Sequence, residues 1–174
     1  MHALVVYESM YGNTRKVATA VADGLSAGAT VSTARAKAVT ADDVAAADLV
    51  VVGGPTHAWT MSRPATRRGA VEATHKPKGS TLVVEDGAQD AGLREWIAAL
   101  PRHGAAKQFA TFDTRRRAPL GLSGSAAHAA RRRLIQRGWH SVRPPQAFYV
   151  TKSDQLEPGE LAHARAWGEA LLTG

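Results

Sequence analysis

The sequence predicts an α/β fold, a doubly wound sandwich in which five parallel strands are joined by crossover helices. Short apolar runs recur along the chain, and the strongest is DLVVVGG at Asp48–Gly54. Such runs are typical of strands covered on both faces. Between the runs, apolar residues recur at helical spacing, as at Val17, Ala20, Val21 and Leu25. Strands that alternate with helices indicate a parallel sheet with a helix layer on each face.

The expected elements follow one another along the chain. Strands are expected at Leu4–Tyr7, Thr30–Ala34, Asp48–Gly54, Gln108–Phe112 and Ala147–Thr151. Helices are expected from Asn13 to about Leu25, in a short stretch capped by Asp42 or Asp43, and at Leu93–Leu100, Ser125–Arg137 and Pro158–Leu172. The chain after Pro55 is expected to be a loop, and residues 73–89 are either an extra edge strand or a mobile insertion. Residues 115–125 are also expected to form a loop.

Length and composition favour one domain over residues 1–174. The chain has 174 residues, 44% of them apolar, which is enough for one well-buried core but short for two. It has no cysteine, and its seven histidines lack metal-ligand spacing, so no disulfide and no metal site is expected. No basic leader precedes the first strand and no apolar run approaches the roughly 18 residues of a membrane span, so a cytoplasmic protein is expected.

The chain is basic, with 22 Lys and Arg against 15 Asp and Glu, a net charge of +7. This charge favours anionic ligands or acidic partners. Part of the excess lies in two runs, Arg115 to Arg117 and Arg131 to Arg133. The second run occupies successive helix positions, so its side chains should point in different directions into solvent. The first run is expected to lie in a loop at the carboxyl end of a strand. Its side chains either contact a phosphate or carboxylate of a ligand or point into solvent, and the sequence favours neither.

The turn after the first strand is a candidate site. The stretch VVYESMYGNTRKVATAV, residues 5–21, passes from strand to helix through residues with few apolar side chains. A helix start offers unpaired backbone N–H groups and the positive end of the helix dipole, which together suit a phosphate. Ser9 and Thr14 can add hydroxyl donors, Asn13 an amide, and Gly12 a close backbone approach. On this turn alone, a phosphate site and a plain helix cap are equally open.

The same stretch resembles the flavodoxin signature, in which strand apolar residues and an aromatic are followed by Ser, Gly and Thr. The order of elements also resembles the flavodoxin-like plan over most of the chain, with sheet order 2-1-3-4-5. Flavodoxins hold the FMN phosphate in this loop. The resemblance therefore implies non-covalently bound FMN, with the phosphate at Ser9, Met10, Tyr11, Gly12, Asn13 and Thr14.

A second stretch, VVVGGPTHAWTMSRP at Val50–Pro64, follows the third strand. In flavodoxins the loop at this place lies along the isoalloxazine ring, so the resemblance implies ring contacts from Pro55, Thr56, His57, Ala58 and Trp59. The loop after the fourth strand also faces the flavin in the family, which adds Thr114 and Arg115 as weaker candidates. Both main loops flank the expected switch point of the sheet.

The chain departs from single-electron flavodoxins in its charge and in its third loop. Those flavodoxins are typically acidic and often place an aromatic on each side of the ring, whereas Asp113 to Ser125 here contain no Tyr or Trp. One flavin face is therefore expected to be open to a substrate. Nearby cations favour the reduced, anionic flavin. We expect higher reduction potentials than in acidic flavodoxins, and two-electron chemistry with an anionic or extended acceptor.

The expected function is electron transfer or a flavin-dependent oxidoreductase activity linked to NAD(P)H or a quinone. The expected partner is a redox protein or a small-molecule electron donor or acceptor, and no catalytic residue is assigned. The alternative is a non-enzymatic module that uses its basic surface to bind a protein or nucleic acid. Nucleic acid is the weaker option, because no helix-turn-helix, zinc finger or aromatic RNA-binding motif is recognisable.

Overall fold

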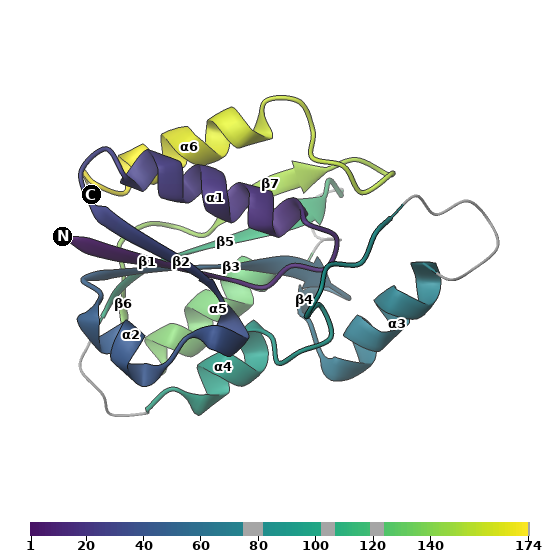
Figure 1. Ribbon diagram of the computed structural model, residues 1–174, viewed down its shortest axis with the longest axis horizontal. Helices are drawn as coiled ribbons and strands as arrows, with labels where there is room; N and C mark the ends of the chain where they lie inside the picture. The colour runs from purple at the N-terminus through teal and green to yellow at the C-terminus, as the bar shows by residue number, and fades with distance from the viewer. Residues whose placement is uncertain (75–81, 102–106, 119–123, 174) are drawn as a thin grey trace.

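The fold is centred on a twisted sheet, seen edge-on in the computed structural model of the chain (Figure 1), which describes residues 1–74, 82–101, 107–118 and 124–173. Long strands pair in parallel, in the spatial order β2 (Thr30–Arg35), β1 (His2–Tyr7), β3 (Leu49–His57), β5 (Gln108–Arg116) and β7 (Gln146–Val150). With the two-residue strands β4 and β6 set aside, these strands are the second, first, third, fourth and fifth along the chain. The predicted order 2-1-3-4-5 is confirmed.

Two short strands complete the sheet in the described part of the chain. β6 (His140–Ser141) pairs with the beginning of β5, while β7 pairs with its end, so the two together occupy the fifth strand position. β4 (Thr60–Met61) folds back on the end of β3 as an antiparallel hairpin. This hairpin lies at the carboxyl edge of the sheet, where ligands bind in open α/β folds.

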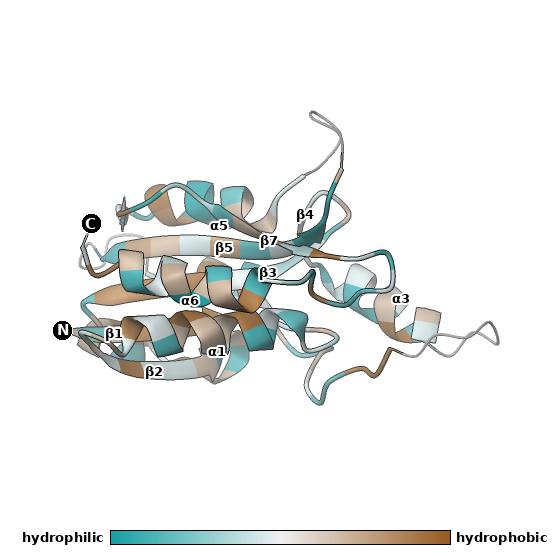
Figure 2. Cartoon of the chain, turned by 90° about the horizontal axis from the view of Figure 1, so that it is seen from above, coloured by the Kyte–Doolittle hydropathy of each residue, from teal (hydrophilic) through white to brown (hydrophobic). Residues whose placement is uncertain are grey.

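Helices cover both faces of the sheet. On one face α1 (Asn13–Leu25) and α6 (Glu160–Ala170) lie side by side (Figures 1 and 2). On the other lie α2 (Ala41–Ala46), α4 (Leu93–Ala99) and α5 (Ala126–Ile135). A single 3-10 turn, η1 (Ala36–Ala38), follows β2. Within the described ranges, no helix is long and apolar enough to cross a membrane.

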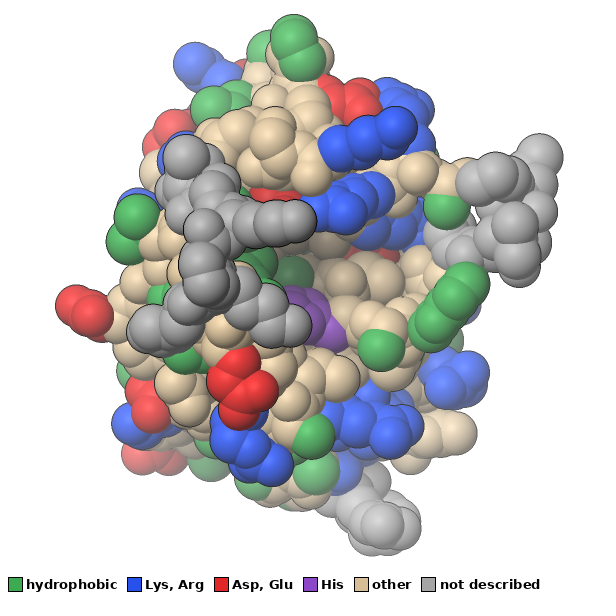
Figure 3. Space-filling view, turned by 90° about the vertical axis from the view of Figure 1, so that its right-hand side faces the viewer, with side chains coloured by type: hydrophobic (Ala, Val, Ile, Leu, Met, Phe, Trp, Pro, Cys, Tyr) green, Lys and Arg blue, Asp and Glu red, His purple; other side chains and the backbone are tan. Residues whose placement is uncertain are grey.

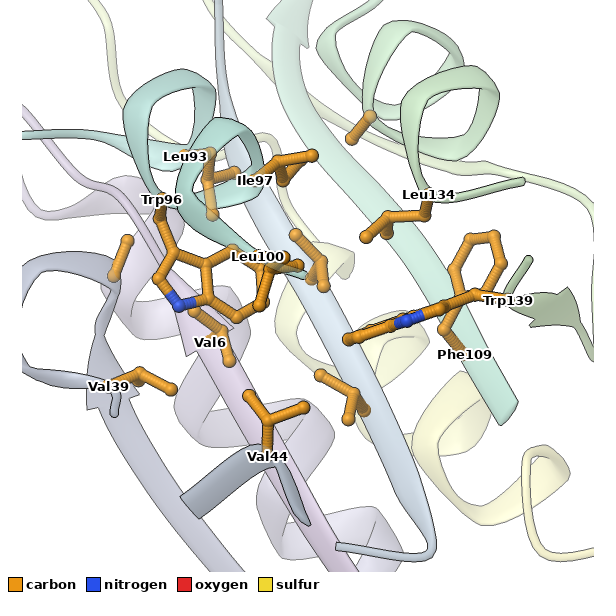
Figure 4. Packing of buried hydrophobic residues seen from close by; sticks show 14 of the residues in the cluster. Val6, Val39, Val44, Leu93, Trp96, Ile97, Leu100, Phe109, Leu134 and Trp139 are labelled. Atoms are coloured by element: carbon orange, nitrogen blue, oxygen red, sulfur yellow. The ribbon is translucent and has the colours of Figure 1, made fainter. Parts of the chain in front are cut away.

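The sheet buries apolar side chains in two layers, because successive residues of a strand point to opposite faces. In β1, Ala3 and Val5 belong to the layer under α1 and α6, while Leu4 and Val6 belong to the layer facing α2, α4 and α5. Figure 4 shows this second layer, in which residues of three helices meet strand residues: Val6, Val39, Val44, Leu93, Trp96, Ile97, Leu100, Phe109, Leu134 and Trp139. The central strands are thus buried on both sides, as their unbroken apolar runs predict.

The continuous loop expected after Pro55 is wrong, because the hairpin with β4 and an 11-residue helix, α3 (Pro64–Thr74), form there. Figures 1 and 2 show α3 beyond the carboxyl edge of the sheet, away from both helix layers. Pro64 occupies its first helical position, which suits proline because the N–H it lacks has no helical partner there. The buried residue of α3 is Arg67. A search for apolar residues at helical spacing cannot detect a helix whose buried side chain is charged.

The extra edge strand at residues 73–89 is not formed by the described part of that segment. Residues 73 and 74 end α3, residues 82–89 contain no strand, and residues 75–81 lie outside the described residues. The backbone N–H of Glu85 donates to the carbonyl of Met10 at 2.9 Å. The segment therefore returns to the turn after β1 instead of extending the sheet.

The end of β5 and the cap of α2 also differ from the prediction. Residues 115 and 116 continue β5 instead of starting a loop. Helix α2 is capped by Thr40, not by Asp42 or Asp43: the Thr40 hydroxyl accepts the N–H of Asp43, and the Asp43 carboxylate accepts the N–H of Thr40. This reciprocal arrangement is a capping box, in which the acidic residue supports the cap.

Candidate functional site

A cleft of about 420 Å³ opens at the carboxyl edge of the sheet, within the size range of small-molecule sites. Figure 3 looks onto this edge and shows the hollow, with Lys and Arg side chains on part of its rim. Three chain segments form most of it: the start of α1, the β3–β4 hairpin and the end of β5. The lining residues are Met10, Tyr11, Asn13, Thr14, Pro55, Thr56, His57, Ala58, Trp59, Thr114, Arg115, Arg116, Gly124, Val150 and Asp154.

The head of α1 has the geometry of an anion-binding turn. Gly12 immediately precedes the helix with φ of +88°, a left-handed conformation that glycine adopts without strain, and no side chain caps the helix start. Its N–H donates to the hydroxyl of Ser9 at 3.1 Å. Ser9 is fully buried and, like Gly12, does not line the cleft. The first backbone N–H groups of α1 therefore have no side-chain cap as a hydrogen-bond acceptor.

Thr14 and Asn13 join the head of α1 to the other side of the cleft. The hydroxyls of Thr14 and Thr114 are 2.7 Å apart, and the Asn13 side-chain amide donates to the carbonyl of Asp154 at 2.6 Å. Asp154 follows β7 with φ of +56°, a conformation that few residues other than glycine, Asn and Asp adopt. The amide of Asn13, which sequence analysis offered to a phosphate, is therefore used here to hold the β7 turn.

Next to the head of α1, the Glu85 carboxylate lies between two guanidinium groups. Arg15 is 2.5 Å and Arg35 2.9 Å from its oxygens. Burial raises the pKa of Glu85, but the hydrogen bonds and charges of Arg15, Ser9 and Arg35 outweigh it and lower the pKa overall. The carboxylate is ionised and its charge is balanced within the protein, so it does not leave an uncompensated negative charge beside the turn.

The β3–β4 hairpin carries the predicted ring-side residues. Its tip consists of Ala58 and Trp59 with φ of +43° and +74°, the sign pattern of a type I′ turn, although neither residue is glycine. Trp59 is 63% exposed. A Cβ on Gly124 would lie 1.8 Å from the Trp59 carbonyl oxygen, so the loop before α5 packs directly on the hairpin backbone. This contact holds a strained turn in place at the cleft.

His57 immediately precedes the tip of the hairpin and is half-buried in the cleft wall. Burial lowers its pKa, with a smaller lowering from Arg67 and opposing contributions from Glu8 and Asp154. Its ring is therefore neutral near pH 7, and one nitrogen can accept a hydrogen bond.

The end of β5 is held by a fully buried carboxylate, Asp113. One of its oxygens, Oδ2, accepts the hydroxyl of Ser125 at 2.5 Å, the hydroxyl of Thr56 at 3.1 Å and the N–H of Ala127 at 3.1 Å. Its other oxygen, Oδ1, lies 3.6 Å from Nε of Arg115. Asp113 thus connects β3, β5 and the start of α5 directly behind the cleft wall.

The cleft brings together eleven of the thirteen residues that sequence analysis selected, all but Ser9 and Gly12. Arg116, Gly124, Val150 and Asp154 also line it and were not selected. The carboxyl-edge rule could have pointed to the loop after the fifth strand, and so to Asp154. Among the described residues, no group of three or more His, Asp and Glu side chains could hold a metal ion.

The arginine runs differ in their partners. Arg116 pairs with Asp154 at 2.8 Å, and Arg117 pairs with Glu157 at 2.9 Å while lying 3.9 Å from the centre of the Tyr149 ring. In the second run, the Nε of Arg131 donates to the Ser141 hydroxyl. Arg132 and Arg133 line one groove between α4 and α5, whereas Arg131 is not among the residues that line it.

A sheet of order 2-1-3-4-5 with a cleft between the ends of its first and third strands belongs to the doubly wound class of α/β folds, in which such an edge is the usual place for a ligand. A family model described as a flavodoxin domain matches residues 4–67, which contain the head of α1 and the β3–β4 hairpin. No curated protein matches the chain.

Solved structures resemble the whole chain. A flavodoxin from the domain Archaea has a TM-score of 0.66 at 20% identity, covering 99% of this chain and 97% of that one. Oxidised flavodoxin 2 from Bacillus cereus has a TM-score of 0.65 at 18% identity, and the match covers 99% of both chains. A flavodoxin, WrbA-like protein from Agrobacterium tumefaciens has a TM-score of 0.59 at 21% identity, and the match covers 99% of this chain and 95% of that one. These likenesses show that the chain has the flavodoxin-like fold.

Proposed function

We propose that this chain binds FMN non-covalently in the cleft and uses it as an electron carrier or a flavin-dependent oxidoreductase. The observation that carries the proposal is the head of α1, where a left-handed Gly12 precedes a helix start without a side-chain cap, and the first helical residues, Asn13 and Thr14, line the cleft. Backbone N–H groups in this arrangement favour a phosphate. The flavodoxin domain match over residues 4–67 covers this turn and supports the same reading.

The residues of the cleft fit FMN along its length. The polar groups Asn13 and Thr14 stand at the α1 end, and Pro55, Ala58 and Trp59 supply apolar and aromatic surface at the hairpin end. No Asp or Glu other than Asp154 lines the described part of the cleft, and the Asp154 carboxylate pairs with Arg116. A phosphate would therefore meet N–H and O–H donors without an unpaired carboxylate beside it.

In this function the residues of the cleft would bind FMN, orient it and shield it from solvent. The start of α1 and the Thr14 hydroxyl would hold the phosphate, and the hairpin would lie along the ring. When bound, FMN supplies the capacity to take up and release electrons. Neutral His57 can accept or pass a proton at one ring nitrogen in the cleft wall. The exposed indole of Trp59 offers a surface to an extended acceptor such as a quinone, or to a redox partner protein.

The test is a fluorescence titration of dialysed protein with FMN and, in parallel, with riboflavin, which lacks the phosphate. We expect quenching by the unaltered chain with a clear preference for FMN. Thr14→Glu places a carboxylate at the phosphate position and should weaken FMN binding by at least about tenfold, while changing riboflavin binding much less.

Thr19→Glu is the matched control, because Thr19 is exposed on the same helix and does not line the cleft. It should leave the affinity for FMN unchanged. Circular dichroism establishes that both variants are folded. Equal affinities of the unaltered chain for FMN and riboflavin, or no quenching by either, would contradict the proposal.

A further inference from the structure

Asp113 and Arg115 form a charge pair at the ring side of the cleft. Both lie at the end of β5, and their closest charged atoms, Asp113 Oδ1 and Arg115 Nε, are 3.6 Å apart. The Asp113 side chain is fully buried, and that of Arg115 is 19% exposed. A buried charge is screened little by water or salt, so it acts on its surroundings more strongly than a surface charge does.

The contacts of Asp113 are those of an ionised carboxylate. Its Oδ2 atom accepts three hydrogen bonds, from Ser125, Thr56 and Ala127. Its Oδ1 atom is buried and has no hydrogen-bond partner among the described residues, so the guanidinium of Arg115 is what balances that side of the carboxylate. A carboxyl group that accepts hydrogen bonds at one oxygen and faces a cation at the other donates no hydrogen bond of its own.

The two charges act on the cleft from different positions. Arg115 lines the cleft and also donates from Nη1 to the carbonyl of Gly124 at 3.1 Å, which keeps its guanidinium against the cleft wall. Asp113 does not line the cleft, but it contacts two lining residues, Thr56 and Arg115. Hence the cation of this pair faces the cleft, and its anion lies behind the cleft wall and opposes its effect.

We propose that Asp113 and Arg115 together set the reduction potential of a flavin bound in this cleft, Arg115 raising it and Asp113 lowering it. The inference rests on the proposed function, since it concerns FMN bound there. Reduction adds negative charge to the ring, so a nearby cation stabilises the reduced form and a nearby anion destabilises it. Asp113 is thus a positioning residue for Thr56 and the start of α5, and also an electrostatic one.

The test is a spectroelectrochemical titration of FMN-loaded protein. Asp113→Asn keeps the shape of the side chain and removes its charge, so it should raise the midpoint potential. Arg115→Gln leaves the buried anion unopposed and should lower it. The double variant should lie between the two single variants. Each tenfold change in the ratio of affinities for reduced and oxidised FMN corresponds to about 30 mV for a two-electron couple.

Arg165→Gln is the control of equal charge change, because Arg165 lies on α6, pairs with Glu169 and does not line the cleft. It should not shift the potential. A purely structural role for the pair predicts shifts of the same sign, or weaker binding with no shift. Arg115→Gln leaves the three hydrogen bonds of Asp113 intact, so the potential of this variant still tests the proposal if Asp113→Asn does not fold. Arg115→Lys should restore most of the potential.

Two results would overturn the inference. Shifts of the same sign in the two single variants, or shifts no larger than that of Arg165→Gln, would refute the charge pair alone and leave FMN binding in place. Failure of the unaltered chain to bind FMN would refute the proposed function and this inference with it. The titration with FMN alone, done first, separates these two cases.

Discussion

The hydroxyl oxygens of Thr14 and Thr114 lie 2.7 Å apart, although the two residues are 100 positions apart in the chain. Both side chains are buried, and Thr114 faces Pro55 in the pairing of β5 with β3. This single hydrogen bond therefore joins the head of α1 to the strand that borders the hairpin. It fixes the distance between the expected phosphate end of the cleft and its ring side.

Thr14→Val and Thr114→Val should have equal effects on stability but different effects on binding. Each breaks the same buried hydrogen bond, so each should lower the free energy of unfolding by about 1 kcal/mol, measured by urea titration. Thr14→Val also removes a donor from the head of α1 and should weaken FMN binding by about tenfold. A larger loss of affinity in Thr114→Val than in Thr14→Val would place the phosphate elsewhere.

Helices α1 and α6 pack closely because Gly168 has no side chain. A Cβ on Gly168 would lie 2.3 Å from the carbonyl oxygen of Val21, so Gly168→Ala forces the helices apart. We expect a loss of about 2 kcal/mol in the free energy of unfolding. Gly69→Ala is the matched change in α3, where no atom lies within 4 Å of the added Cβ, and it should stabilise by about 0.5 kcal/mol. Thermal unfolding of both variants measures the contrast.

The buried Arg67 connects α3 to α4. Its Nη1 donates to the Ser62 hydroxyl at 2.8 Å and to the Glu95 carboxylate at 3.2 Å, and its side chain is 2% exposed. Arg67→Met leaves the buried Ser62 hydroxyl without this partner and removes one of the two donors to the Glu95 carboxylate, and it should cost about 2 kcal/mol, read from urea unfolding. The neighbouring Arg68 is exposed, so Arg68→Met should change stability by less than about 0.5 kcal/mol. Equal effects of the two substitutions would mean that the network contributes nothing.

The sheet could be predicted because its strands carry their own signal. β1 and β3 are buried on both faces, so their sequences are unbroken apolar runs, and crossover helices leave few other topologies. Helix α3 could not be predicted, because its buried residue is the charged Arg67, whose partners Ser62 and Glu95 lie outside the helix. A local apolar pattern carries no information about such a partner.

The positions of the cleft loops follow from strand order, whereas the side-chain contacts in the cleft do not. The turn after β1 and the hairpin after β3 meet because parallel strands end at the same edge. The pairing of Thr14 with Thr114, the use of the Asn13 amide by Asp154 and the burial of Ser9 depend on distances between segments far apart in the chain. The role of Asp113 likewise depends on Thr56, Arg115 and Ser125, which contact its carboxylate.

His57 should make the protein less stable as the pH falls below its ordinary pKa. Burial lowers the pKa of His57 in the folded state below the value of 6.5, so below 6.5 the unfolded chain binds a proton that the folded chain does not. The His57 contribution to stability is therefore highest above about pH 6.5, decreases as the pH falls from there towards the lower folded-state pKa, and then levels off.

Thermal unfolding at about pH 7.5 and about pH 5.5 measures this effect, and His57→Gln should reduce the difference between the two melting temperatures. Glu85 and Glu95, whose pKa values are lowered, lose their stabilising contributions only below their ordinary value of 4.5, outside this interval. An unchanged pH dependence in His57→Gln would show that another group titrates there.

Arg133 should weaken the fold slightly through repulsion of Arg94. Burial is the main cause that lowers the pKa of Arg94, and the charges of Arg133 and Arg63 lower it further. Arg133 is half-buried and has no carboxylate partner among the described residues, so Arg133→Gln should raise the free energy of unfolding by about 0.5 kcal/mol at low salt. The gain should shrink as salt is added, because screening weakens the repulsion in the unaltered chain. Arg132→Gln removes the same charge at the adjacent, more exposed position, which does not act on Arg94, and urea titrations should show no gain for it.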